Sequence, residues 1–156
     1  MRARSLFALF GSVFVFSGLL AGRESQVVVE DTGSTNRTGI RVVLGHGGQA
    51  TIETDNHDTR QIKLSEQLCN QLLEHLKAVG PLSSLPTRHC VKSVSFGSKV
   101  FVEYNGARSP DLSCPGPEDP ALASLTKSAL DVLQNAREAS GITGRRIFSV
   151  PRPAPK

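Results

Sequence analysis

The spacing of the apolar residues changes period along this chain, and no other feature restricts its fold as strongly. Residues 40–44 and 50–54 alternate between apolar and polar side chains, as strands with one buried face do. From Leu64 to Leu76 a leucine recurs every four residues, which is the stripe of an amphipathic helix. Alternation returns over residues 92–104, and a second helical stripe follows over residues 120–140. This order of strands, helix, strands and helix predicts an α+β fold.

Turn residues divide the alternating segments. Gly45–Gly48 predicts a hairpin between residues 40–44 and 50–54, because tight turns need the positive φ angles that glycine tolerates. Lys92–Tyr104 predicts a second hairpin around positions 97 and 98, with a further turn at 105–106, and residues 26–30 form a candidate first strand. The polar residues 55–60 are expected to be a connection, and Pro110 makes residues 107–113 a poor strand. We therefore expect an antiparallel sheet made from two hairpins and an N-terminal strand, in the order β-β-β-α-β-β-α, with both helices on one face.

Capping residues fix the expected ends of both helices. Ser65 is a good N-cap for the first helix, and Gly80 followed by proline ends it. For the second helix, Asp119 is the cap, Pro120 lies in the first turn and Gly141 is the terminator.

The N-terminus has the pattern of a cleavable export signal. Arg2 and Arg4 precede an uncharged apolar run over residues 6–21, which polar residues follow directly. The run is shorter than the ~20 apolar residues that a spanning helix needs, although an uncleaved anchor is the alternative. We expect residues 1–22 to be a signal peptide, 23–141 a single globular domain, and the basic, proline-rich residues 142–156 a disordered tail. The protein would then be periplasmic or secreted and would meet a membrane only transiently, during export.

The charge of the chain argues against nucleic acid as a partner. The net charge of the whole chain is +4, and loss of Arg2 and Arg4 with the signal lowers it to about +2. Nucleic-acid-binding domains carry a strong basic stripe with interleaved aromatic residues, and the body of this chain has neither. We predict no nucleic-acid partner.

The three cysteines allow three disulfide pairings. Cys69 lies in the first turns of the first helix, and a helix of about 14 residues separates its ends by ~20 Å, which disfavours a bond to Cys90. Cys114 follows the irregular segment that Pro110 creates, so it can return to the end of the hairpin where Cys90 lies. We predict a Cys90–Cys114 disulfide, formed in an oxidising compartment, and a buried free thiol at Cys69.

The histidines and acids lack the spacing of a known metal site. His89 beside Cys90, and the loop that contains Asp55, His57 and Asp58, are candidates, but CxxC, HxxxH and HExxH are absent from the sequence. We predict no metal, no cofactor and no catalytic residue. The rival hypothesis is a small metal-assisted hydrolase that uses His57 with Asp55 or Asp58, or that uses His89.

Alternation assigns the strand residues to two faces of the sheet. The face expected to meet the helices holds Ile40, Val42, Leu44, Ala50, Ile52, Val94, Phe96, Val100, Val102 and Tyr104. The opposite face carries two apolar residues among polar and charged ones, which is typical of a surface for a protein partner. An ordinary solvated face is the alternative. The predicted binding surface consists of Arg41, Val43, Glu53, Lys99, Phe101 and Glu103.

The segments HCVKSVSFG, at residues 89–97, and VEYNGARSPDLSCP, at 102–115, give the chain a resemblance to small exported bacterial proteins of uncharacterised function. The similarity extends from about Gly39 to Gln134. It implies an exported bacterial protein and carries over no activity. We therefore predict a non-catalytic binding or inhibitory module with an unidentified protein partner. An envelope-associated structural protein, held by its basic tail, is a further alternative.

Overall fold

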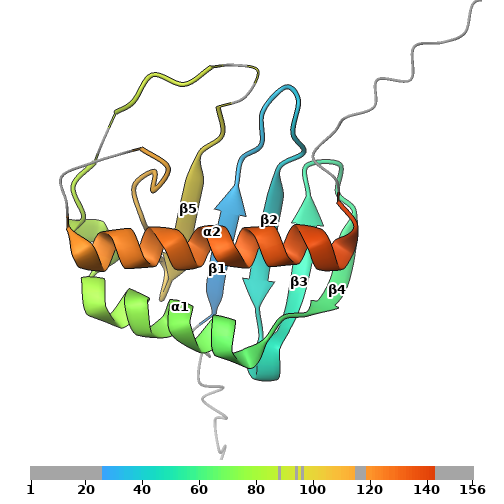
Figure 1. Ribbon diagram of the computed structural model, residues 1–156, viewed down its shortest axis with the longest axis horizontal. Helices are drawn as coiled ribbons and strands as arrows, with labels where there is room; N and C mark the ends of the chain where they lie inside the picture. Colours follow the sequence, from blue (N-terminus) through green and yellow to red (C-terminus); the bar gives the residue numbers. More distant parts are fainter. Residues whose placement is uncertain (1–25, 88, 94, 96, 115–118, 143–156) are drawn as a thin grey trace, which may run out of the picture.

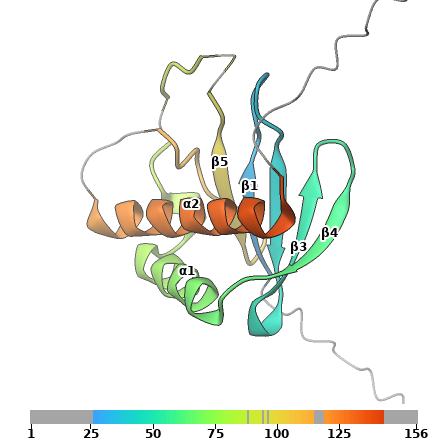
Figure 2. The same ribbon diagram turned by 45° about the vertical axis from the view of Figure 1, so that its right-hand side comes forward.

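The computed structural model describes residues 26–87, 89–93, 95, 97–114 and 119–142. A six-stranded antiparallel sheet is covered on one side by two helices (Figures 1 and 2). The strands are β1 (Val27–Asp31), β2 (Ile40–Leu44), β3 (Gln49–Thr54), β4 (Thr59–Lys63), β5 (Val100–Tyr104) and β6 (Ala107–Arg108), in the order β4-β3-β2-β1-β5-β6. The helices are α1 (Glu66–Val79) and α2 (Pro120–Ser140). The predicted α+β fold is confirmed, whereas the expected signal peptide and all of the expected tail except Ile142 lie outside the described residues.

The N-terminal strand joins the two halves of the sheet. β1 pairs with β2 on one side and with β5 on the other, both antiparallel. Val29 lies opposite Val42 and Val102, and all three side chains are fully buried. A strand between two neighbours has more of its surface covered, which fits the apolar run VVV at its start.

The turn between β2 and β3 depends on glycine at one position. Gly48 has φ 75°, and a Cβ there would come within 2.3 Å of the Leu64 carbonyl oxygen. The Gly48 carbonyl in turn accepts a hydrogen bond of 2.8 Å from the Leu64 N–H. The hairpin turn therefore packs directly against the segment that enters α1.

β4 corrects the expectation that residues 55–60 only connect a strand to a helix. The Thr54 N–H bonds to the Asp58 carbonyl at 3.0 Å, and β4 begins at Thr59. Of the five residues of β4 only Ile62 is half-buried, and the others are exposed. An edge strand with so little burial has no apolar alternation to reveal it.

The expected hairpin around positions 97 and 98 is also corrected. Within residues 91–99 the described positions form no strand, and β5 pairs instead with β6 across the turn at Asn105 and Gly106. Both turn residues have positive φ, 51° and 77°, as a tight hairpin turn requires. The turn was expected, but its role as the hairpin tip was not.

Beyond β6, two side chains accept hydrogen bonds from main-chain N–H groups of β5. The Ser109 hydroxyl accepts a hydrogen bond from the Val102 N–H at 3.0 Å, and the Asp111 carboxylate accepts one from the Val100 N–H at 3.1 Å. Pro110 separates these two residues. The segment is thus held against β5 although it is not a regular strand, as the proline predicted.

Both helices begin and end where the sequence places them. The Ser65 hydroxyl accepts a hydrogen bond from the Leu68 N–H at 3.1 Å, and Asp119 caps α2 through the Ala121 and Leu122 N–H groups. Gly141 ends α2 in the left-handed conformation, with φ 68°. These caps satisfy helix-end groups that would otherwise lack partners.

The core lies between the sheet and the two helices. The helices contribute Cys69, Leu72, Leu76, Leu122, Leu125, Ala129, Val132, Leu133 and Ala136. The described residues of the predicted helix-facing side of the sheet are all buried except Tyr104, which is half-buried, and positions 94 and 96 lie outside the described residues. The other side of the sheet is left uncovered by the helices (Figure 2).

Candidate functional site

The uncovered side of the sheet brings together most of the predicted binding surface. Arg41, Val43, Glu53, Phe101 and Glu103 alternate with buried residues on β2, β3 and β5, and all five are half-buried. We call this side, together with Glu30 and Val28 of β1 and Arg108 of β6, the open face. The strand register places Val43 opposite Val28, and places Glu30 opposite Phe101.

Five charged residues form a continuous chain of ion pairs across the open face. Arg41 contacts Glu53 at 3.0 Å and Glu103 at 3.9 Å. Arg108 contacts Glu103 at 2.6 Å and Glu30 at 2.9 Å. Each arginine is therefore shared by two carboxylates. Because exposed pairs contribute only ~0–1 kcal/mol each, the chain shapes the surface more than it stabilises the fold.

The aromatic ring of the open face is covered by one of these arginines. The guanidinium carbon of Arg108 lies 4.1 Å from the centre of the Phe101 ring, a cation–π contact. The ring is half-buried as a result. On the adjacent strand β1, Val28 lies on the same face and is buried, with 4% of its surface exposed. The open face thus has apolar residues beneath charged side chains that are held in ion pairs.

Lys99 lies at the end of the open face rather than within it. Its side chain is exposed, and its main chain pairs with Thr32, whose N–H bonds to the Lys99 carbonyl at 3.0 Å. The sequence reasoning missed Glu30 and Arg108. Alternation along β1 would have revealed the first, and the turn at Asn105 would have placed the second.

The predicted disulfide is confirmed and lies beside a half-buried lysine. Cys90 and Cys114 are bonded, with their Cα atoms 5.6 Å apart, and Cys69 is a buried free thiol. Lys92 Nζ contacts the Asp111 carboxylate at 2.6 Å and the Ser98 carbonyl at 2.6 Å. This corner ties the segment after β6 to the segment before β5.

Hydrogen bonding controls the ionisation of Asp111. Burial raises the pKa of this carboxyl, but hydrogen bonds from Lys92, from the Ser113 hydroxyl and from the Val100 and Ser113 N–H groups outweigh burial and hold the pKa below its ordinary value. The carboxylate is therefore a structural acceptor, engaged on both oxygens.

Among the described residues, the candidate metal ligands of the rival hypothesis belong to no group of three potential ligand atoms within 4.8 Å of one another. His57 is exposed in the turn after β3, and His89 is exposed beside the disulfide. In this part of the chain, the group of three potential ligands within 4.8 Å of one another is Cys90, Asp111 and Cys114. The two sulfurs of this group are bonded to each other, and a disulfide has no thiolate to bind a metal ion.

A histidine and a serine meet at the interface between the helices. His75 Nδ1 on α1 lies 2.6 Å from the Ser128 hydroxyl on α2. A nucleophilic serine needs such a base, but it must also reach a substrate. Ser128 is buried at 5% exposure, so this pair acts as a polar contact between helices.

Comparison with protein-family models, with curated proteins and with solved structures found no match. The resemblance to exported bacterial proteins therefore remains a prediction from the residues alone. Neither of the two helices that the structure describes is long and apolar enough to cross a membrane.

Proposed function

We propose that this chain is an exported, non-catalytic binding or inhibitory module that contacts a protein partner through the open face. The observation that carries the proposal is the half-buried Phe101 ring beneath Arg108, on the side of the sheet that the helices leave uncovered. Aromatic and arginine side chains supply most of the affinity in protein interfaces. Here both types lie together on β5 and β6 of the uncovered face.

The ion-pair chain gives this surface the means to select a partner. Its arginines and carboxylates surround the apolar residues Val43 and Phe101, as polar rims surround interface cores. A partner with complementary charges can exchange these exposed pairs at little cost, whereas a partner with like charges is repelled. Specificity would come from the charged residues around the apolar pair, and affinity from the Phe101 ring.

Two features support export and a role without catalysis. The Cys90–Cys114 disulfide is compatible with an oxidising compartment, where such bonds persist. The His75–Ser128 pair is enclosed between the helices, where a substrate cannot approach the hydroxyl. A binding role needs no further chemistry from the described residues.

The test is capture of a partner by the purified chain, immobilised away from the sheet. Phe101→Ala removes the ring, and Val91→Ala is the matched control, because Val91 is an exposed apolar residue outside the strands. We expect a partner that binds the wild-type chain and the control, and whose affinity for Phe101→Ala falls by roughly 1 to 3 kcal/mol. Circular dichroism must show that both variants remain folded.

Equal binding by all three chains would show that the partner uses another surface and would refute the proposal. Stoichiometric zinc in the purified protein, lost in His57→Ala or His89→Ala, would instead favour the metal-assisted hydrolase.

A further inference from the structure

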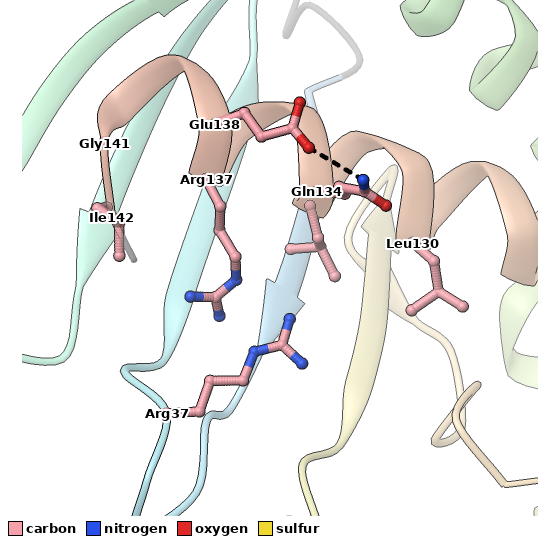
Figure 3. A pocket seen from close by; sticks show the side chains of 8 residues that line it. Arg37, Leu130, Gln134, Arg137, Glu138, Gly141 and Ile142 are labelled. Atoms are coloured by element: carbon pink, nitrogen blue, oxygen red, sulfur yellow. Dashed lines mark hydrogen bonds between the residues drawn. The ribbon is translucent and has the colours of Figure 1, made fainter. Parts of the chain in front are cut away.

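An open pocket runs along α2 on the side of the molecule opposite the open face. Its volume is about 610 Å³, which is within the range of small-molecule sites. The residues that matter for the argument are Arg37, Leu130, Leu133, Gln134, Arg137 and Ile142 (Figure 3). The lining is mostly apolar, and the two arginines lie between Ile142 on one side and Leu130 on the other (Figure 3).

The two arginines share a single carboxylate. Oδ2 of Asp31 lies 3.0 Å from Arg137 Nη2 and 3.1 Å from Arg37 Nη2. The other oxygen, Oδ1, accepts a hydrogen bond of 2.9 Å from the Gly33 N–H. Asp31 is 1% exposed, so this carboxylate cannot turn away from its partners. One negative charge therefore faces two positive ones at this point.

Arg137 has hydrogen-bond donors to spare. The residue is 8% exposed, and its Nη2 also donates to the Thr38 carbonyl at 2.8 Å. Its Nε and Nη1 are buried and have no hydrogen-bond partner among the described residues. Unsatisfied buried donors are costly, and in native structures they need an explanation.

The pKa of Arg137 is consistent with this shortage of hydrogen-bond acceptors. Burial, and next the charge of Arg37, lower the pKa of Arg137, and together they outweigh the opposing effects of Asp31 and Asp55. Glu138 also lines the pocket, but its carboxylate accepts a hydrogen bond of 3.0 Å from the Gln134 amide and points away from the Arg137 guanidinium (Figure 3). An additional anion beside Arg137 would stabilise its charged form.

The apolar part of the pocket extends from the arginines along one face of α2. Leu130 and Arg137 are seven positions apart, a distance of ~10 Å along a helix. Leu133 lies between them, and Leu130 is 45% exposed. Among the described residues, Leu130 and Val91 are the large apolar side chains that are exposed. A ligand with an apolar chain would cover Leu130.

We propose that this pocket binds a small amphiphilic carboxylate, with its carboxylate between Arg37 and Arg137 and its aliphatic chain along Leu133 and Leu130. The unpaired donors of Arg137 are shielded from solvent, so binding requires a side-chain movement that exposes them, whereas Arg37, which is 42% exposed, already presents its guanidinium to solvent. Paired guanidinium groups suit a carboxylate because they present donors in its plane. The site is on the other side of the sheet and does not depend on the function proposed for the open face.

The test is isothermal titration calorimetry of the full purified chain with octanoate. Octanol provides the chain without the charge, and acetate provides the charge without the chain. We expect saturable one-to-one binding of octanoate and at least about tenfold weaker binding of the other two, since each lacks one half of the recognition.

Two variants locate the site. Arg37→Ala should weaken octanoate binding about tenfold through loss of a charge-assisted hydrogen bond, and Leu130→Ser about fivefold through loss of apolar contact. Lys63→Ala and Val91→Ser are the matched controls, because they make the same kinds of change at exposed positions outside the pocket, and they should bind octanoate as the wild type does.

Several outcomes would overturn the proposal. Equal binding of octanol would show an apolar groove without anion recognition, and equal binding of acetate would show a simple anion site. Binding that survives both Arg37→Ala and Leu130→Ser would place the ligand elsewhere. Binding that appears only after removal of residues 144–156 would identify the C-terminal segment of the chain as the occupant.

Discussion

Replacing Asp31 with asparagine tests the buried cluster beneath α2 most directly. Asp31 accepts a hydrogen bond from the Gly33 N–H on one oxygen and one from Arg137 on the other, which also forms an ion pair with Arg37. An amide has one acceptor oxygen, so in either orientation its NH₂ group faces an N–H donor. The variant Asp31→Asn therefore keeps the shape of the side chain, loses the charge and creates a clash between donors.

The magnitude follows from the burial of each partner. Removal of the carboxylate leaves the charge of Arg137 buried without compensation, which typically costs ~3–5 kcal/mol. Arg37 is 42% exposed and can turn to water, so its share is about 0–1 kcal/mol. We expect Asp31→Asn to lower the free energy of unfolding by ~3 kcal/mol.

Urea unfolding under non-reducing conditions, followed by circular dichroism, measures this loss. Glu53→Gln is the control, because it makes the same change in an exposed ion pair with Arg41 and should cost less than ~1 kcal/mol. Arg137→Met in the Asp31→Asn background removes the uncompensated charge and should restore part of the stability. A cost below ~1 kcal/mol for Asp31→Asn would refute the reasoning, since it would mean that the cluster is hydrated or that Arg137 leaves it.

Four further predictions concern the remaining polar and apolar sites. Asp111→Asn should lower the free energy of unfolding at neutral pH and flatten the dependence of that free energy on pH. Folding lowers the pKa of the Asp111 carboxyl, so its ionised form stabilises the protein above the unfolded pKa of ~3.9. This contribution is lost as the pH falls through the pKa of the folded state. Urea unfolding between pH 7 and pH 2 measures this, and an unchanged slope would contradict it. Replacing Cys90 and Cys114 by serine should cost ~3 kcal/mol in the chain-entropy model. Cys69 should resist a thiol reagent until the fold is denatured, because burial, and then the nearby Glu66, raise the pKa of its thiol. Phe101→Ala should lower the free energy of unfolding by ~1–2 kcal/mol, about half the value for a fully buried ring. A loss of ~3 kcal/mol or more, measured by urea unfolding, would show that the ring is fully buried.

The fold was predictable where local sequence and tertiary structure agree. The stripe from Leu64 to Leu76 and the caps Ser65 and Asp119 place both helices correctly, because each rests on contacts within one element. The disulfide followed from the same kind of reasoning, since Pro110 limits where the chain can go after β5.

The two corrected segments failed for opposite reasons. β4 is an edge strand with one half-buried residue, so it has no alternation for a sequence pattern to detect. Residues 92–96 alternate between polar and apolar side chains, yet their described positions form no strand. Lys92 is held by Asp111 and Ser98, and the edge of β5 that does not pair with β1 pairs with β6. Alternation predicts which side chains can share a face, and the partner decides whether a strand forms.

The open face was largely predictable, whereas the pocket was not. Five of the six predicted surface residues lie on β2, β3 and β5 of one sheet, where a period of two is enough to assign a face. Arg137 looks like a solvated residue at the end of a helix, and its contact with Asp31 joins residues 106 positions apart. That contact depends on how α2 crosses the end of β1, which no local pattern encodes (Figure 1).

The two surfaces use arginine in opposite ways, and this difference separates their roles. On the open face Arg41 and Arg108 are each shared by two carboxylates, so their donors are already engaged. Beneath α2 one carboxylate is shared by two arginines, and buried donors of Arg137 remain free. An anion gains little by displacing carboxylates from the open face, but it satisfies unpaired donors in the pocket. Anion binding should therefore depend on Arg37 and be indifferent to Arg108, while a protein partner held by the Phe101 ring should show the reverse dependence.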